Sequence, residues 1–240
     1  IGYYSADFYN HAMSYLLAGL FESQNKSEFE IIAFSFSPTK NDEMSKRITK
    51  AFDKFINVNF KTDKEISELS RELNIDIAVD LLCFTENNRM GIFFNKCAPI
   101  QLNYLGYPGT SGSKFIDYIV ADKILIPKEN QKYYSEKIIY LPNTYQVRDS
   151  TQKISNKTYK RKDFNLPEDN FVFCCFNQNY KITPDVYDIW MRLLKKVDGS
   201  VLWLLKNSDI GINNLKKEAR KRGVDPNKII FAERMAMPEH

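Results

Sequence analysis

Continuous apolar runs that alternate with helix-like segments constrain the fold of this chain more than any other feature. Runs such as "FEIIAFSF" (29–36) and "IDIAVDLL" (75–82) lack the polar alternation of a half-exposed strand. They are typical of a parallel sheet that helices cover on both faces, so the fold class is α/β. Further strands are expected at 1–5, 55–60, 100–106 and 117–122, and helices at 11–23, 42–53, 63–74 and 88–97.

A polar, charged stretch at residues 146–168 interrupts this alternation. Its composition indicates a linker, so we predict an N-terminal Rossmann-like domain at 1–147, a linker at 148–168 and a second domain at 169–240. The second domain reads as one βαβαβ half of a nucleotide-binding Rossmann-like fold. Because the other half and an initial methionine are missing, the chain is expected to be a fragment. The strands of this half are expected at 171–176, 200–205 and 228–232, and its helices at 184–196 and 211–222.

Charge and hydropathy exclude two classes of partner. The 240 residues carry a net charge of +4, part of it in runs such as Lys160-Arg161-Lys162. No nucleic-acid-binding module accompanies these runs, so we interpret them as solvated surface. No apolar run reaches the roughly 18 residues of a membrane helix, and no signal peptide is visible. We therefore expect a cytoplasmic protein without a nucleic-acid or membrane partner.

The cysteines and histidines do not form a metal-binding pattern. No CxxC spacing occurs, and the only histidines are His11 and His240, so zinc is not expected. The thiols are expected to be buried and free, including the pair inside an apolar strand. The four cysteines are Cys83, Cys97, Cys174 and Cys175.

Polar residues follow the first expected strand, at the carboxyl edge where parallel α/β sheets bind ligands. Asp7 and His11 lie in the stretch "SADFYNHAMSY". Asn10 is expected to cap the following helix, which would place His11 in its first turn. The helix dipole disfavours imidazolium there, so a neutral His11 could accept a proton or a hydrogen bond. The alternative is a capping histidine without chemistry.

A glycine-rich stretch, "LGYPGTSG" (105–112), follows the strand expected at 100–106. Gly106, Gly109 and Gly112 suggest a tight turn in which backbone amides approach a ligand closely. No Gly-Lys-Ser/Thr follows, so this is not a Walker loop. A plain turn is the alternative.

The strand expected at 171–176 is followed by "NQNYK", just before a helix starts. Thr183 can cap that helix, and Pro184 suits its first turn. Free amides at a helix start bind anions, and Lys181 adds a point charge suited to phosphate. Gln178 offers a donor and an acceptor to a base or a sugar. The alternative is an ordinary exposed loop.

Together these segments resemble the catalytic region of O-linked N-acetylglucosamine transferases and the related SPINDLY proteins. The resemblance implies a GT-B architecture with two Rossmann-like domains, inversion at the sugar carbon and no metal or other cofactor. No Asp-x-Asp motif that could hold a metal occurs in the sequence. The matching stretches are "IGYYSADFYNH", "APIQLNYLGYPGTSG", "DYIVAD", "YYSEKIIYLPNTY", "FNQNYKI", "SVLWLLKN" and "IIFAERMAMPEH".

The resemblance implies roles for residues at the nucleotide. The lysine of "YKI" supports the leaving diphosphate in the family, and it is Lys181 here. The glutamine of "FNQ" contacts the nucleotide, and it is Gln178 here. The loop after the last strand contacts the base through its backbone, here near Met235.

The resemblance also implies residues at the sugar and the acceptor. The aspartate and histidine of the first motif lie beside both, at Asp7 and His11, and the motif does not decide which is the base. The leucine and glycine of "LGYPG" lie against the sugar, here Leu105 and Gly106.

Two motifs depart from the family pattern. The family usually has His-Pro-x-x-His after the asparagine, whereas this chain has "HAMSY", in which Ala12, Met13 and Tyr15 replace residues that line or support the pocket. A thioether at Met13 would remodel the sugar pocket. The family's Gly-His/Tyr-Thr is replaced by Cys83-Phe84-Thr85.

The leading hypothesis is a glycosyltransferase that moves a sugar from a nucleotide donor to serine or threonine hydroxyls of proteins. N-acetylglucosamine from UDP-GlcNAc is the first candidate sugar and fucose from GDP-fucose the second. The parent protein would typically carry preceding tetratricopeptide repeats, and the fragment alone is expected to be inactive. The alternatives are a non-catalytic sugar-nucleotide binding scaffold and a small-molecule epimerase.

Overall fold

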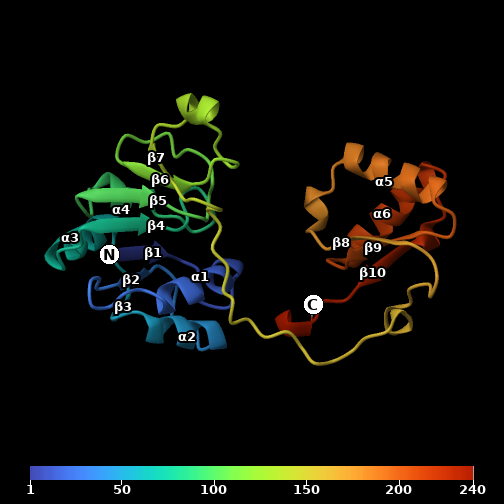
Figure 1. Cartoon of the computed structure of the whole chain (residues 1–240), viewed down its shortest axis with the longest axis horizontal. Helices are drawn as coiled ribbons and strands as arrows, with labels where there is room; N and C mark the ends of the chain where they lie inside the picture. Colours follow the sequence, from blue (N-terminus) through green and yellow to red (C-terminus); the bar gives the residue numbers. More distant parts are fainter. Residues whose placement is uncertain (240) are drawn as a thin grey trace. The chain divides into compact units, whose positions relative to one another are not determined.

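Short apolar strands build a parallel sheet in the first of two units into which the chain divides, Ile1–Thr151. In this computed structural model, which describes residues 1–239, the strand order is β3-β2-β1-β4-β5-β6-β7 (Figure 1). The order reverses beside β1, so the edge between β1 and β4 is a topological switch point, where open α/β sheets bind ligands. The strands are β1 Gly2–Ser5, β2 Ile32–Ser35, β3 Lys54–Asn57, β4 Ile77–Asp80, β5 Ile100–Asn103, β6 Tyr118–Ala121 and β7 Lys137–Tyr140.

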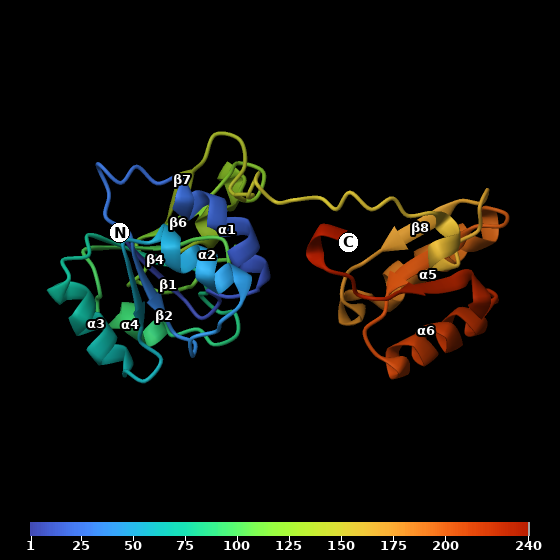
Figure 2. The same ribbon diagram turned by 90° about the horizontal axis from the view of Figure 1, so that it is seen from below.

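Helices cover both faces of this sheet (Figures 1 and 2). Neighbouring residues on one strand enter different cores: Tyr3 and Val79 pack with α1 and α2, whereas Tyr4 and Ala78 pack with α3 and α4. Burial on both faces explains why these strands have continuous apolar sequences. The helices are α1 Ala12–Glu22, α2 Glu43–Ala51, α3 Asp63–Glu72 and α4 Met90–Phe94.

A smaller parallel sheet forms the second unit, which starts at Gln152. Its three strands, β8 Val172–Cys175, β9 Val201–Leu205 and β10 Ile229–Ala232, follow the order β10-β9-β8. Helices α5 Pro184–Lys196 and α6 Asp209–Lys221 contribute to its core, in which Leu202 and Leu204 pack with Tyr187 and Met191. The expected α/β class with parallel sheets is confirmed.

Several elements differ from the sequence-based expectations. Strand β7 was not expected, because it is an edge strand whose Lys137 is exposed and whose apolar pattern is short. The helix expected at 88–97 covers only Met90–Phe94. Within the predicted linker, the 3-10 turn Arg161–Phe164 places Phe164 against Trp203 with ring centroids 5.2 Å apart.

The cysteines are all free, but their burial differs from the expectation. Cys83 and Cys97 are buried, as predicted, whereas the prediction for the other pair was wrong. Cys174 is exposed and Cys175 half-buried, because α5 and α6 pack only against the face of β8 that carries Cys175. Along residues 1–239, no helix is long and apolar enough to cross a membrane.

Candidate functional site

The two polar residues after β1 lie together at the switch point of the first sheet. Oδ2 of Asp7 is 3.4 Å from Nδ1 of His11. The Asp7 side chain is only 11% exposed and that of His11 is 40% exposed, so the pair joins a buried carboxyl to an accessible imidazole. The Asp7 backbone is held by its N–H, which donates to Ser5 Oγ, and by its carbonyl, which accepts from Ser14 Oγ.

The expected cap of α1 was wrong: His11 itself is the N-cap residue. Its backbone is extended (φ −140°, ψ 154°), and its Nδ1 accepts the backbone N–H of Met13 at 3.3 Å. Asn10 caps elsewhere, because its Oδ1 accepts the N–H of Met44 at the start of α2. Its own N–H donates to Asp42, so this loop is tied to α2.

One nitrogen of His11 therefore faces two partners that need different tautomers. If Nδ1 accepts from Met13, the ring proton is on Nε2; if Nδ1 donates to Asp7, Nε2 is a free base. The second arrangement is the Asp–His relationship of an oriented general base. Burial raises the pKa of Asp7, and the neighbouring His11 opposes this rise.

Strained backbone lies beside this pair, at the ends of β4 and β5. Cys83 has φ 50° and Leu105 has φ 70°, and each such conformation costs about 1–3 kcal/mol for a non-glycine residue. Gly106 follows immediately, and a Cβ there would lie 2.0 Å from the carbonyl oxygen of Leu81. Only glycine fits this close approach of two loops.

The side chains of the expected sugar-binding residues point largely into the core. Leu105 is 8% exposed, and Met13 packs, half-buried, against the same cluster. Contact of Met13, Leu105 and Gly106 with a sugar stays a prediction.

Glu136, just before β7, fixes the rest of the glycine-rich loop. Its carboxylate accepts from Thr110 Oγ1 at 2.7 Å, from the N–H of Ser111 at 2.7 Å and from Ser111 Oγ. Burial alone would raise the pKa of Glu136, but these hydrogen bonds outweigh it and hold the pKa below its ordinary value.

The predicted nucleotide residues of the second unit lie at the carboxyl end of β8. Gln178 precedes the 3-10 turn Asn179–Lys181, and its carbonyl accepts the N–H of Lys181 at 3.0 Å. Lys181 is exposed, and no ion pair engages it within residues 1–239. Thr183 caps the 13-residue helix α5 and Pro184 is its first residue, as the sequence predicted.

Met235 lies beyond the end of β10, at the same edge of the small sheet. It lines a pocket of about 220 Å³ together with Leu205, which ends β9. Arg234 and Met237 complete the lining. The residues predicted at the nucleotide lie in the second unit, whereas those predicted at the sugar and the acceptor lie in the first.

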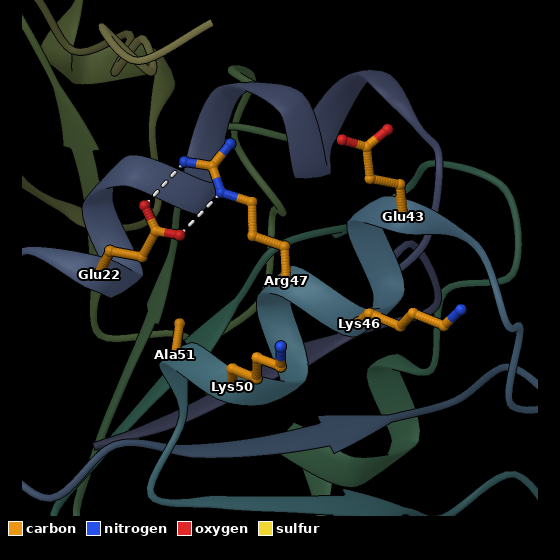
Figure 3. A pocket seen from close by; sticks show the side chains of 6 residues that line it. All are labelled: Glu22, Glu43, Lys46, Arg47, Lys50 and Ala51. Atoms are coloured by element: carbon orange, nitrogen blue, oxygen red, sulfur yellow. Dashed lines mark hydrogen bonds and ion pairs between the residues drawn. The ribbon is translucent and has the colours of Figure 1, made fainter.

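A surface hollow of about 390 Å³ lies on α1 and α2 of the first unit (Figure 3). Arg47 dominates it and binds Glu22 through two hydrogen bonds of 2.7 Å. A third bond reaches the buried Asp149. Because the guanidinium of Arg47 is already bound to Glu22 and Asp149, we interpret these contacts as structural and not as a ligand site. The lining residues are Glu22, Glu43, Lys46, Arg47, Lys50 and Ala51.

The described part of the chain contains no group of three or more His, Cys, Asp or Glu residues placed to hold a metal ion. His240, the second histidine, lies outside the described residues.

The sequence analysis did not identify three buried polar residues next to the loops of the candidate site: Asp80, Asn103 and Glu136. Asp80 and Asn103 end β4 and β5 and are buried. A polar residue that closes two successive apolar strands, "IAVD" and "IQLN", is a signal that could have identified them. Glu136 carries no comparable signal, because a charged residue before a strand is usually exposed.

The fold and these motifs define a glycosyltransferase, and comparison with known families specifies which kind. A family model described as glycosyl transferase family 41 matches residues 1–160 and 152–240. The chain therefore belongs to this family, which confirms the resemblance seen in the motifs.

Curated relatives carry names of the same kind. The chain is 37% identical over its whole length to a probable UDP-N-acetylglucosamine–peptide N-acetylglucosaminyltransferase, SEC, from Arabidopsis thaliana. It is 23% identical to a UDP-N-acetylglucosamine–peptide N-acetylglucosaminyltransferase of Caenorhabditis elegans, again over the whole chain. A probable enzyme of the same activity, SPINDLY from Arabidopsis thaliana, is 27% identical over 84% of the chain. The chain spans only 25%, 31% and 22% of these relatives.

Solved structures support the GT-B type of fold. A mutant O-GlcNAc transferase from Thermobaculum terrenum superimposes with a TM-score of 0.86 at 25% identity, over 99% of this chain and 45% of that one. A glycosyltransferase from Rickettsia africae gives a TM-score of 0.60 at 12% identity, over 98% of this chain and 68% of that one, which shows the fold alone.

Proposed function

We propose that this chain is the catalytic region of an enzyme that transfers N-acetylglucosamine from UDP-GlcNAc to serine or threonine hydroxyls of proteins, with inversion and without a metal. The observation that carries the proposal is the family 41 match over the whole chain. The relatives from Arabidopsis and Caenorhabditis are named for transfer of N-acetylglucosamine from UDP-GlcNAc to peptides, which supports this donor and this acceptor.

The leaving diphosphate would be held in the second unit. Bond cleavage leaves extra negative charge on the diphosphate, and a positioned cation stabilises that charge more in the transition state than in the ground state. The exposed Lys181 and the first-turn amides of α5 are suited to this role. Gln178, adjacent through its backbone bond to Lys181, would contact the nucleotide, and the backbone near Met235 would contact the base.

The acceptor hydroxyl would lose its proton on the side of the first unit. His11 acts as the base when its Nδ1 donates to Asp7 and its Nε2 is free. Asp7 then orients the ring and stabilises the imidazolium that forms. The capping tautomer, in which Nδ1 accepts from Met13, is inactive in this scheme because Nε2 carries the proton.

The proposed activity is that of the complete protein. The chain spans about a quarter of the relatives' length, and the 240 residues alone are proposed to be inactive. Tetratricopeptide repeats in the parent protein would present acceptor proteins.

The test is intact-mass spectrometry of acceptor proteins incubated with the complete protein and either UDP-GlcNAc or GDP-fucose. A gain of one N-acetylhexosamine supports the proposal. A gain of one deoxyhexose corrects the donor to GDP-fucose. Nucleotide binding without any gain on protein would replace the transferase with a scaffold, and a modified nucleotide sugar without a protein product would indicate an epimerase.

A further inference from the structure

Two buried side chains at the ends of β4 and β5 each leave one oxygen without a hydrogen-bond partner among the described residues. Asp80 is 2% exposed and Asn103 is 0% exposed. The unpaired atoms are Oδ2 of Asp80 and Oδ1 of Asn103. Burying an unpaired polar atom is unfavourable, so two of them at one place require a physical reason.

The strand register brings these two residues side by side. Asp80 is the register partner of Asn103 in the parallel ladder. Register partners on neighbouring strands project to the same face of a sheet and are one strand spacing apart. The two unpaired oxygens therefore belong to adjacent side chains in the same buried layer.

The other end of each side chain is already fixed. Oδ1 of Asp80 accepts the N–H of Leu82 at 2.9 Å. Nδ2 of Asn103 donates to the carbonyl oxygen of Tyr107 at 2.9 Å, so the amide presents its oxygen, not its NH₂ group, on the remaining side. Each of the two adjacent side chains thus keeps one unpaired acceptor, and a hydrogen shared between them would satisfy both.

We propose that Asp80 takes up a proton in mildly acidic solution, that its Oδ2–H then donates to Oδ1 of Asn103, and that this bond joins the ends of β4 and β5 beneath the active-site loops. Protonation gives the pair a donor while both fixed hydrogen bonds are kept. Burial raises the pKa of Asp80 to about 6, against the hydrogen bonds from the Leu82 and Cys83 backbone, so the neutral acid is the main form below about pH 6.

The groups that face Asp80 are neutral themselves. They are Tyr4 on β1, Cys83 after β4 and Cys97 after α4. Burial raises the pKa of both thiols to about 12, and it raises the pKa of Tyr4 well above its ordinary value. Among residues 1–239, no cation acts on Asp80 to hold it as a carboxylate.

The bond would position the loops that the proposed function uses. Cys83, with φ 50°, lies three residues after Asp80, and Leu105, with φ 70°, lies two residues after Asn103. Ionised Asp80 would place a carboxylate against the amide oxygen and push the two strand ends apart. Asp80 is thus a positioning residue for the Leu105–Gly106 turn, and this part of the inference rests on the proposed function.

The direct test is a pH titration of the intact protein labelled with ¹³C at its aspartate carboxyl groups. Asp80→Asn identifies the resonance by its disappearance. We expect the titration midpoint of Asp80 to lie well above the ordinary ~3.9 of aspartate and to fall in Asn103→Leu, because the neutral acid loses its acceptor. An ordinary midpoint, or one unchanged in Asn103→Leu, would overturn the proposal.

The rate of sugar transfer by variants of the complete protein is a second test of the role of Asp80. Asp80→Asn keeps a donor at the Oδ2 position, so it should retain activity that Asp80→Leu loses, and should hold that activity to higher pH than the parent enzyme. Equal loss in both variants would mean that a carboxylate is needed, against the proposal. If the parent enzyme transfers no sugar, the proposed function fails, whereas the titration still decides the state of Asp80.

Discussion

Nδ1 of His11 lies 3.4 Å from Oδ2 of Asp7, and the same nitrogen caps helix α1. One side chain therefore combines a structural role with the proposed catalytic role, and two substitutions can separate them. His11→Asn keeps a good N-cap and removes the imidazole, whereas His11→Ala removes both. The free energy of unfolding should fall by about 1 kcal/mol in His11→Ala and little in His11→Asn.

The transfer activities of the two variants should not differ in the way that their stabilities do. If His11 is the base, both variants should lose sugar transfer by roughly 10²–10⁴-fold. Urea unfolding and initial transfer rates, measured on the same preparations, give the two readings. Retained transfer in His11→Asn would reduce His11 to a cap and direct attention to Asp7.

Lys181 offers a cleaner separation of stability from activity because its side chain is exposed. Lys181→Ala should leave the unfolding transition unchanged and lower transfer by roughly 10²–10³-fold, because the developing charge on the diphosphate loses its cation. Lys196→Ala removes an exposed lysine at the far end of α5 and is the matched control. Comparable turnover in the Lys181 and Lys196 variants would remove Lys181 from the mechanism.

Much of the fold was accessible from the sequence because burial on both faces leaves mostly apolar runs in central strands such as β2, β4 and β6. Strand β7 was not, since it is a half-exposed edge strand whose four residues begin with a lysine. The exposure of Cys174 was also missed, because local sequence does not tell which sheet face is covered.

Some features of the candidate site could likewise be predicted from the sequence, and others could not. Thr183 and Pro184 predicted the start of α5 correctly, because capping chemistry is local. The cap of α1 was misassigned, since Asn10 binds Met44 from a helix that starts more than thirty residues later. Tertiary contacts of this kind, and the pairing of Asp80 with Asn103, depend on strand order and not on neighbouring residues.

Gly106 should be the least replaceable glycine of its loop. In Gly106→Ala, the new Cβ would lie 2.0 Å from the Leu81 carbonyl oxygen, so backbone must move. In Gly109→Ala, the Cβ meets only the far end of the Tyr107 side chain, which can rotate away. We expect Gly106→Ala to lower the free energy of unfolding by about 1–3 kcal/mol and to impair transfer, with Gly109→Ala close to the parent. Thermal unfolding of both variants checks this, and equal effects would contradict the close approach.

The Arg47–Asp149 pair should make the first unit sensitive to acid. A hydrogen bond from Arg47 lowers the pKa of Asp149 to about 2. Since the folded pKa is below the unfolded ~3.9, the stabilisation is present above pH 4 and is lost as the pH falls towards 2.

Arg47→Met should lower the free energy of unfolding at neutral pH by about 3 kcal/mol, because the fully buried Asp149 carboxylate loses its cation. It should also flatten the dependence of stability on pH between about 4 and about 2, since the folded pKa of Asp149 moves towards its unfolded value. Lys46→Met, on the exposed face of the same helix, is the control for removal of one positive charge. Urea unfolding across a pH series measures both effects. Equal losses in the two variants would show that net charge, and not the bond to Asp149, stabilises this face.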